Sequence, residues 1–137
     1  MTQAYTGGCA CGGIHYETPD EPLAMLHCQC RDCQRKSGTG HSSYLVFPRA
    51  GGKLSGAASH WDMIADSGDT KTRGFCPKCG SPVYVVFPAN AGIFAIHAAS
   101  LDDPGRFQPQ FVTYAGRGHA WDKADPALTK FERMPTR

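Results

Sequence analysis

Three cysteines fall within six positions of the sequence, in the run Cys28-Gln29-Cys30-Arg31-Asp32-Cys33. This spacing is typical of metal ligands and not of disulfide partners. A thiolate is a natural ligand of zinc, which binds four donors tetrahedrally in proteins. Three cysteines with no obvious fourth ligand leave one position for water or a substrate. The run therefore predicts a reactive zinc site.

A second metal-binding motif is the run from Phe75 to Gly80, in which Cys76 and Cys79 are separated by two residues and followed by glycine. This pattern is typical of a zinc knuckle, whose turn directs backbone N–H groups at the sulfurs. One knuckle supplies only two ligands. Cys9 and Cys11 are flanked by four glycines, which permit the bend that a shared metal requires.

The seven cysteines divide naturally into a closed set of four and an open set of three. The four are Cys9, Cys11, Cys76 and Cys79, and the three are Cys28, Cys30 and Cys33. The alternative is to pair Cys76 and Cys79 with two of the triplet, which leaves Cys9 and Cys11 without partners. We favour the first division, although spacing alone does not prove it.

The triplet could instead hold zinc for structure only, with a histidine as fourth ligand, because structural zinc sites are usually closed. His27 is adjacent to Cys28 and would point to the opposite face of a strand. His41 and His97 are better candidates, but lone histidines are usually exposed or hydrogen-bonded core residues.

Basic and aromatic residues offer possible substrate contacts. The densest basic group, Arg31, Arg35 and Lys36, lies beside the triplet and could bind a carboxylate of a thiol carrier. The alternative is a solvated surface, because single exposed charges contribute little. Four aromatic residues are more typical of the core or its rim than of a substrate platform: Tyr16, Trp61, Tyr114 and Trp121.

Length and composition indicate one domain over residues 1–137, with a motif-bearing core at about 5–121 and a tail at 122–137. The formal charge is +2, and two zinc ions on seven thiolates would change it to about −1. The basic residues do not form a run, so we do not expect nucleic-acid binding. The sequence shows neither an export signal nor a run of about 18 apolar residues. We therefore expect a cytoplasmic protein with reduced cysteines and no membrane partner.

Short alternating segments bounded by glycine and proline predict a mostly β fold. The expected strands are 14–18, 23–28, 41–47, 59–64, 70–75, 83–87, 93–97 and 107–114. One short helix is expected at 32–38, with Cys33 near its start and Gly38 at its end. Residues 51–58 are expected to form a loop or hairpin, and Trp121 and Phe131 to anchor the end of the chain.

Together, three segments resemble the cysteine motifs of the glutathione-dependent formaldehyde-activating enzyme family, which includes centromere protein V. They are Gly8–Gly12, Cys28–Gly38 and Phe75–Gly80. The resemblance extends from Gly8 to about Trp121. It implies a β-tent fold of several coiled antiparallel sheets, a structural zinc on the set of four cysteines and a catalytic zinc on the triplet.

In the enzymes that name this family, glutathione adds reversibly to formaldehyde to give S-hydroxymethylglutathione, a carbon–sulfur lyase reaction in reverse. The chemistry of the triplet agrees with such a role. A free thiol of pKa about 8.5 is mostly protonated near pH 7, whereas a thiol bound to zinc is a nucleophilic thiolate. The expected function is a zinc-dependent carbon–sulfur lyase-like enzyme that acts on a small thiol and a small electrophile. The alternative is a non-catalytic, zinc-stapled module that binds a protein.

We expect the purified protein to be colourless and to contain two zinc ions per chain, as measured by elemental analysis. Two ions agree with the division into four and three cysteines, whereas a single zinc would contradict it. A coloured protein with iron would instead indicate an iron–sulfur cluster.

Overall fold

The computed structural model describes residues 3–135, and strands dominate it. The strands are β1 (Tyr5–Gly8), β2 (His15–Thr18), β3 (Ala24–Cys28), β4 (Ser42–Pro48), β5 (Lys53–Ser55), β6 (Ser59–Ile64), β7 (Thr70–Phe75), β8 (Pro82–Val86), β9 (Ile93–His97), β10 (Phe111–Thr113) and β11 (Thr129–Lys130). The helices are α1 (Arg31–Ser37) and the short 3-10 helices η1 (Pro88–Asn90), η2 (Ala98–Ser100), η3 (Pro104–Arg106) and η4 (Ala115–Arg117).

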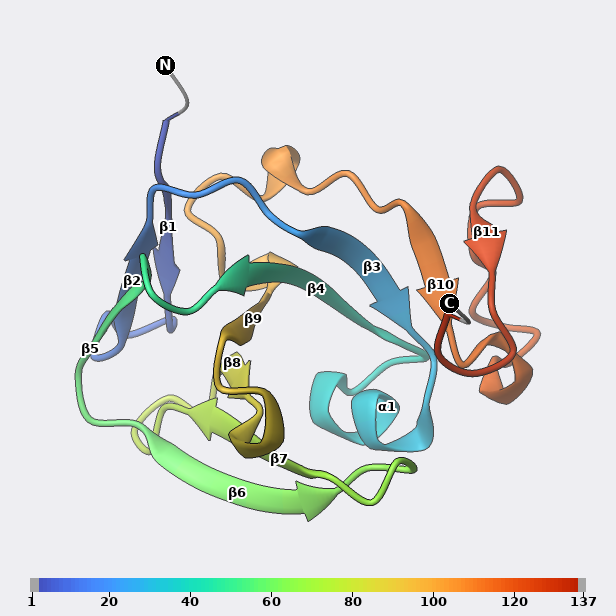
Figure 1. Cartoon of the computed structure of the whole chain (residues 1–137), viewed down its shortest axis with the longest axis horizontal. Coiled ribbons are helices and arrows are strands. Elements are labelled where there is room, and N and C mark those ends of the chain that lie inside the picture. The colour runs from blue at the N-terminus through green and yellow to red at the C-terminus, as the bar shows by residue number, and fades with distance from the viewer. Residues whose placement is uncertain (1–2, 136–137) are drawn as a thin grey trace.

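The strands form two sheets. A three-stranded sheet has the order β1-β2-β5, and an eight-stranded sheet has the order β11-β10-β3-β4-β9-β8-β7-β6. The large sheet curls so that β3 and β4 lie across from β6 and β7, with α1 between them (Figure 1). The expectation of a small, mostly β domain with antiparallel sheets is confirmed. One exception is β10, which pairs in parallel with β3 and β11.

Alternating side chains divide the large sheet into two apolar faces. On β4, Leu45 and Phe47 are fully buried in the main core, where Phe94 and Ile96 of β9 join them. Tyr44 and Val46 point to the opposite face, because successive side chains of a strand alternate. That second face carries Cys28 and Cys33, so the core that stabilises the domain is separate from the face that holds the cysteine triplet.

The helix beside the triplet starts one residue earlier than expected, at Arg31, and has Gly38 at its end as the sequence predicts. Cys30 is its N-cap, and the Cys30 sulfur accepts a hydrogen bond from the Cys33 N–H at 3.3 Å. At the other end, Gly38 adopts a left-handed conformation with φ 80°, and its N–H bonds to the Gln34 carbonyl. Such a C-terminal glycine is favoured because it has no Cβ.

Several elements differ from the sequence-based expectations. The expected strand 107–114 is shortened to Phe111–Thr113, after Pro109, which has no N–H to donate to the ladder. Two strands lie where none was expected, β1 and β11, and β5 lies in the segment 51–58 that was expected to form a loop or hairpin. The glycines of β1 obscured its strand character, because glycine disfavours strands. Gly7 is nevertheless required there, since a Cβ would lie 2.3 Å from the Tyr16 hydroxyl oxygen.

The predicted anchors at the end of the chain have different outcomes. The Phe131 ring packs edge-on against Phe111 at 5.7 Å, so this prediction is confirmed. The prediction for Trp121 is wrong. Its side chain is 68% exposed, and its ring stacks on His119 at the surface.

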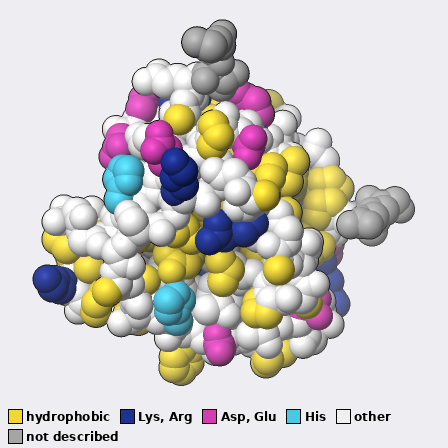
Figure 2. Space-filling view, turned by 60° about the vertical axis from the view of Figure 1, so that its left-hand side comes forward, with side chains coloured by type: hydrophobic (Ala, Val, Ile, Leu, Met, Phe, Trp, Pro, Cys, Tyr) yellow, Lys and Arg dark blue, Asp and Glu magenta, His cyan; other side chains and the backbone are white. Residues whose placement is uncertain are grey.

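The surface shows a mixture of side-chain types. On the face in Figure 2, lysine and arginine side chains are few and are interspersed with acidic and hydrophobic ones. Among residues 3–135, no helix combines the length and apolar character needed to cross a bilayer.

The division into core and surface predicts how an isoleucine-to-alanine substitution changes the free energy of unfolding at a buried and at an exposed position. Ile96→Ala removes a side chain that is fully buried in the main core, so we expect a loss of about 2–5 kcal/mol in the free energy of unfolding. Ile64→Ala, at a position that is 65% exposed, is expected to change it by less than about 0.5 kcal/mol. Urea denaturation measures both, and equal effects would contradict this assignment of the core.

Candidate metal centres and the adjoining cavity

The set of four cysteines comes together in a geometry that suits zinc. The Sγ atoms of Cys9, Cys11, Cys76 and Cys79 all lie within 4.8 Å of one another. The Sγ atoms of Cys9 and Cys11 are 3.7 Å apart, and those of Cys11 and Cys76 are 3.6 Å apart. Zinc–sulfur bonds of 2.3 Å in a tetrahedron place the sulfurs about 3.8 Å apart. These residues could therefore hold a zinc ion.

Backbone turns position these sulfurs. In the first turn, the Ile14 N–H donates to Cys9 Sγ at 3.2 Å, and Gly12 adopts φ 80°. In the second, the Lys78 N–H lies 3.4 Å from Cys76 Sγ, and Gly80 adopts φ 75°. N–H groups directed at sulfur and a left-handed glycine are the features expected of a zinc knuckle. The two turns join the end of β1 to the β7–β8 connection.

The triplet forms a second, more buried cluster. The Sγ atoms of Cys28, Cys30 and Cys33 also lie within 4.8 Å of one another, so one ion could bind all three. Cys28 is the last residue of β3, and Cys33 lies in the first turn of α1. Cys28 and Cys33 are buried, and Cys30 is half-buried. Within residues 3–135, no further histidine, cysteine or carboxylate joins this cluster.

The two histidines considered as fourth ligands have other contacts. His41 Nδ1 bonds to Asp122 at 2.9 Å. His97 is buried, and its ring packs against Tyr44 with centroids 4.8 Å apart. Burial, with Arg73 nearby, lowers the pKa of His97 to about 4, so this side chain is neutral at pH 7. Within the described part of the chain, the triplet thus offers three sulfur ligands and no fourth.

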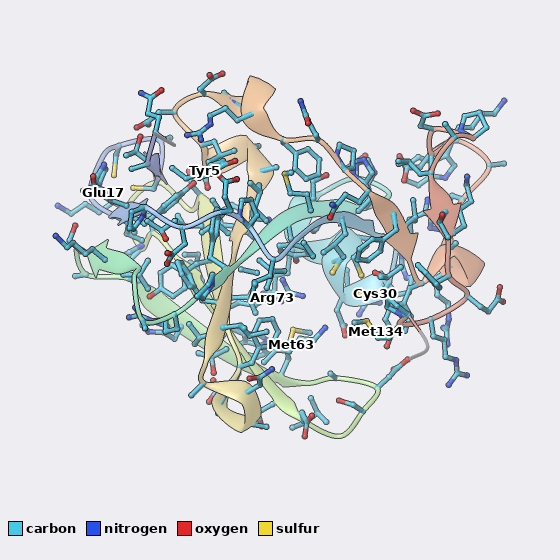
Figure 3. The ribbon with its side chains drawn as sticks, turned by 45° about the horizontal axis from the view of Figure 1, so that its top comes forward. Tyr5, Glu17, Cys30, Met63, Arg73 and Met134 are labelled. Carbon is cyan, nitrogen blue, oxygen red and sulfur yellow. The ribbon has the colours of Figure 1, made fainter. Side chains whose placement is uncertain are left out.

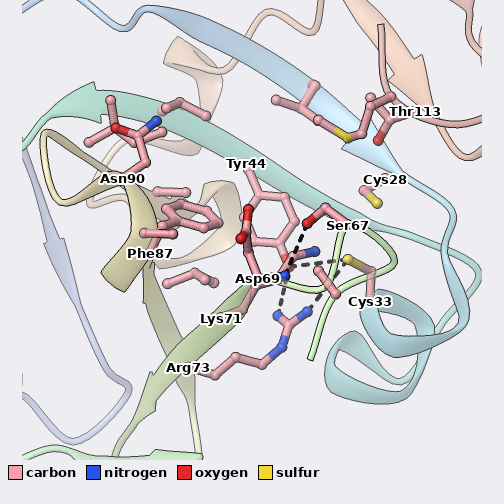
Figure 4. A pocket seen from close by; sticks show the side chains of 18 of the residues that line it. Cys28, Cys33, Tyr44, Ser67, Asp69, Lys71, Arg73, Phe87, Asn90 and Thr113 are labelled. Carbon is pink, nitrogen blue, oxygen red and sulfur yellow. Dashed lines mark hydrogen bonds between the residues drawn. The ribbon is translucent and has the colours of Figure 1, made fainter. Parts of the chain in front are cut away.

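A buried arginine lies against the triplet. Arg73, on β7, is only 4% exposed. It donates from Nη1 to Tyr44 Oη at 2.9 Å and from Nη2 to Cys33 Sγ at 3.7 Å, and Tyr44 Oη lies 3.4 Å from the same sulfur (Figure 4). Hydrogen bonds from the Cys28 and Cys30 thiols hold the pKa of Cys33 below its ordinary value. Tyr44 and Arg73 add to this effect, which outweighs burial.

The charge of Arg73 suits a metal–thiolate centre. Among the ion pairs of residues 3–135, none involves this arginine. A buried charge is costly unless it is paired. Zinc with three thiolates carries a net charge of −1 and would provide the partner that Arg73 lacks. The donor set and its surroundings thus fit the metal.

A cavity of about 330 Å³ opens beside the triplet, and Cys28 and Cys33 form part of its wall. Its cationic lining residues are Lys71 and Arg73. Met134, close to the end of the chain, also lines it, on the side of the molecule where Cys30 lies (Figure 3). Cys28 and Cys33, although buried, therefore border a space that could hold a small molecule.

The cations predicted from the sequence lie elsewhere. Arg31, Arg35 and Lys36 are on α1 but do not line the cavity. Arg31 bonds to Gln34, and Lys36 lies over the Trp61 ring at 5.5 Å. Their contact with a substrate carboxylate stays a prediction. Sequence reasoning missed Arg73 because its strand alternates polar residues, which resembles an exposed strand.

Asp122, near the end of the chain, contacts the loop that carries the triplet. Gln29, between Cys28 and Cys30, is buried, and its Nε2 bonds to the Asp122 carbonyl at 3.2 Å and carboxylate at 3.3 Å. The hydrogen bonds from His41 and Gln29 lower the pKa of Asp122 and outweigh partial burial, which raises it. Asp122 therefore holds the cysteine loop as an anion at neutral pH.

Comparison with known proteins identifies relatives by sequence and by fold. A family model described as "Glutathione-dependent formaldehyde-activating enzyme" matches residues 4–117, which is most of the chain. A crystal structure of a Rhodobacter sphaeroides protein is similar in fold, with a TM-score of 0.54 and 19% identity. The match covers 71% of this chain and 87% of that protein. At this identity the structural match shows the fold alone.

The contact between Asp122 and the cysteine loop predicts an effect on metal binding. We expect Asp122→Ala to weaken zinc binding at the triplet by about 10–100-fold, the usual effect of removing a group that orients metal ligands. Competition with a chelator would show this loss for one of the two zinc ions. Asp125→Ala removes an exposed carboxylate three positions along the chain. It should leave the affinity for both zinc ions unchanged. If both variants bind zinc like the wild type, Asp122 does not support the site.

Proposed function

The chain belongs to the glutathione-dependent formaldehyde-activating enzyme family, and from this premise we propose that it is a zinc-dependent carbon–sulfur lyase-like enzyme. It would add a small electrophile of the formaldehyde type to a low-molecular-weight thiol such as glutathione, and remove it again. The observation that carries this proposal is the sulfur triplet, of which Cys28 and Cys33 lie in the wall of a cavity, with no fourth ligand among residues 3–135.

Two metal sites follow from this proposal. Cys28, Cys30 and Cys33 would hold the catalytic zinc, and Cys9, Cys11, Cys76 and Cys79 a structural zinc. Zinc bound by these three thiolates would keep an incoming thiol in its nucleophilic thiolate form near neutral pH.

The residues of the chain would then position the reactants. Cys28 and Cys33 place the reaction centre at the cavity wall. A guanidinium has five N–H donors, and Arg73 directs three of them at Met63, Tyr44 and Cys33. Its remaining donors suit the oxygen of a carbonyl electrophile as negative charge develops there. The new carbon–sulfur bond forms as the carbonyl π electrons move to oxygen, which takes up the proton released by the thiol.

We further propose that residues 1–137 act as one cytoplasmic domain. Its partners would be a small thiol and a small electrophile, and it would bind neither nucleic acid nor membrane. The alternative function, a zinc-stapled module for a protein partner, needs no cavity at the triplet. The position of Cys28 and Cys33 in the cavity wall therefore favours the enzyme.

The test is the rate at which glutathione and formaldehyde equilibrate. We expect zinc-loaded protein to accelerate it, and Cys28→Ser to lower kcat/KM by at least about 100-fold, because loss of a metal ligand removes the activation of the thiol. Thermal unfolding checks that the variant is folded. The exposed substitution Thr39→Ala, outside the cavity, should retain the rate. An unchanged rate with wild-type protein, or full activity in Cys28→Ser, would contradict the proposal.

A further inference from the structure

We infer that the electrophile carries an apolar substituent of several carbon atoms, so that the substrate class is alkyl or aryl aldehydes larger than formaldehyde. This inference rests on the proposed function, which supplies the reaction, and adds the identity of the second substrate. The reaction balances without a redox partner. The thiol sulfur bonds to the aldehyde carbon, the carbonyl π pair moves to oxygen, and the thiol proton ends on that oxygen.

The size of the cavity is the first argument. Ligand cavities are usually about 300–1,000 Å³, and this one has a volume of about 330 Å³. A water molecule takes up about 30 Å³ in the liquid. Formaldehyde has only two non-hydrogen atoms, so it would leave most of the cavity unfilled. The space suits a larger molecule that reaches Cys28 and Cys33 with one end.

The chemistry of the cavity floor is the second argument. Six apolar side chains from β3, β4, β8, β9 and the segments beside them form it: Leu26, Val46, Val85, Phe87, Ile93 and Ala95. In Figure 4 the labelled cysteines lie at one end of the cavity, and Phe87 and Asn90 lie toward the other. Hydrocarbon that extends from the sulfurs over this floor is removed from water, which favours binding.

The strand register explains why the floor is hollow. Val46 pairs with Ala95, Ala95 pairs with Val85, and Val85 pairs with Arg73, so these four form one row across β4, β9, β8 and β7. The smallest side chain, Ala95, lies between the two valines. The small Ala95 side chain therefore leaves a hollow in the cavity floor. Arg73 stands at the end of the same row.

The thiol carrier fits the floor less well than the aldehyde does. Glutathione has two carboxylates, an ammonium group and two amides, and burial of these groups without hydrogen bonds is costly. The polar lining residues come mainly from β7 and the loop before it, where Ser67, Asp69 and Lys71 lie. Polar parts of a thiol can bond there, whereas the floor suits the hydrocarbon part of the aldehyde.

The test compares straight-chain aldehydes from formaldehyde to hexanal, with glutathione as the thiol and zinc-loaded protein. We expect kcat/KM to rise about fourfold for each methylene that enters the cavity, which corresponds to about 0.8 kcal/mol. Ala95→Leu fills the hollow, and we expect it to lower the ratio of hexanal to formaldehyde kcat/KM at least about tenfold. The matched substitution Ala57→Leu, at an exposed position outside the cavity, should keep the wild-type ratio.

A rate that stays level or falls with chain length, while formaldehyde is converted, would overturn the inference and leave the proposed function intact. An equal ratio in wild type and in folded Ala95→Leu would also overturn it.

A binding experiment separates this inference from the proposed function. If no aldehyde is converted, the proposed function fails, and binding of unreactive 1-hexanol then decides the inference. Methyl NMR shifts of Val46, Val85 and Ile93 on addition of 1-hexanol, lost in Ala95→Leu, would support an apolar ligand. Unchanged methyl signals would overturn it.

Discussion

The structure depends on one electrostatic constraint. Seven thiols are packed in two tight clusters, and neighbouring thiols in a cluster cannot easily ionise together. Hydrogen bonds with the Cys30 and Cys33 thiols raise the pKa of Cys28, whereas hydrogen bonds with the Cys28 and Cys30 thiols lower the pKa of Cys33. Closely packed sulfurs therefore resist simultaneous ionisation. A zinc ion removes this conflict, because it pairs with every thiolate at once. The turns around Gly12 and Gly80 hold the sulfurs of the set of four, and the N-terminus of α1 helps to hold those of the triplet, so that each cluster could bind one ion.

The curled sheet separates stability from chemistry. Leu45, Phe47, Phe94 and Ile96 fill the main core on one face. The other face carries Arg73, the cavity and the triplet, of which Cys33 belongs to α1. Because strand side chains alternate, single strands such as β4 and β9 supply both faces. In the proposed enzyme, changes to the cavity floor would therefore alter substrate preference without direct contact with the main core.

The local motifs were predictable from the sequence, and the long-range contacts were not. Spacing and flanking glycines predicted each cysteine motif and the short helix, because these features depend on residues close in the chain. The pairing of Cys9 and Cys11 with Cys76 and Cys79 came instead from the cysteine count, since the alternative leaves two cysteines without partners. Arg73 and Asp122 reach the triplet only through the pairing of distant strands and the path of the chain end, which no local pattern encodes. Trp121 was misassigned because a large aromatic usually indicates burial, whereas here it stacks on His119 at the surface.

The most direct test of this account is a crystal structure of the zinc-loaded protein soaked with glutathione, with anomalous scattering measured at the zinc edge. The account predicts one zinc bound by Cys9, Cys11, Cys76 and Cys79. It predicts a second zinc bound by Cys28, Cys30 and Cys33, with the glutathione sulfur as fourth ligand. A side chain of the protein in that fourth position, in the presence of glutathione, would contradict the account and leave a structural role for both metals.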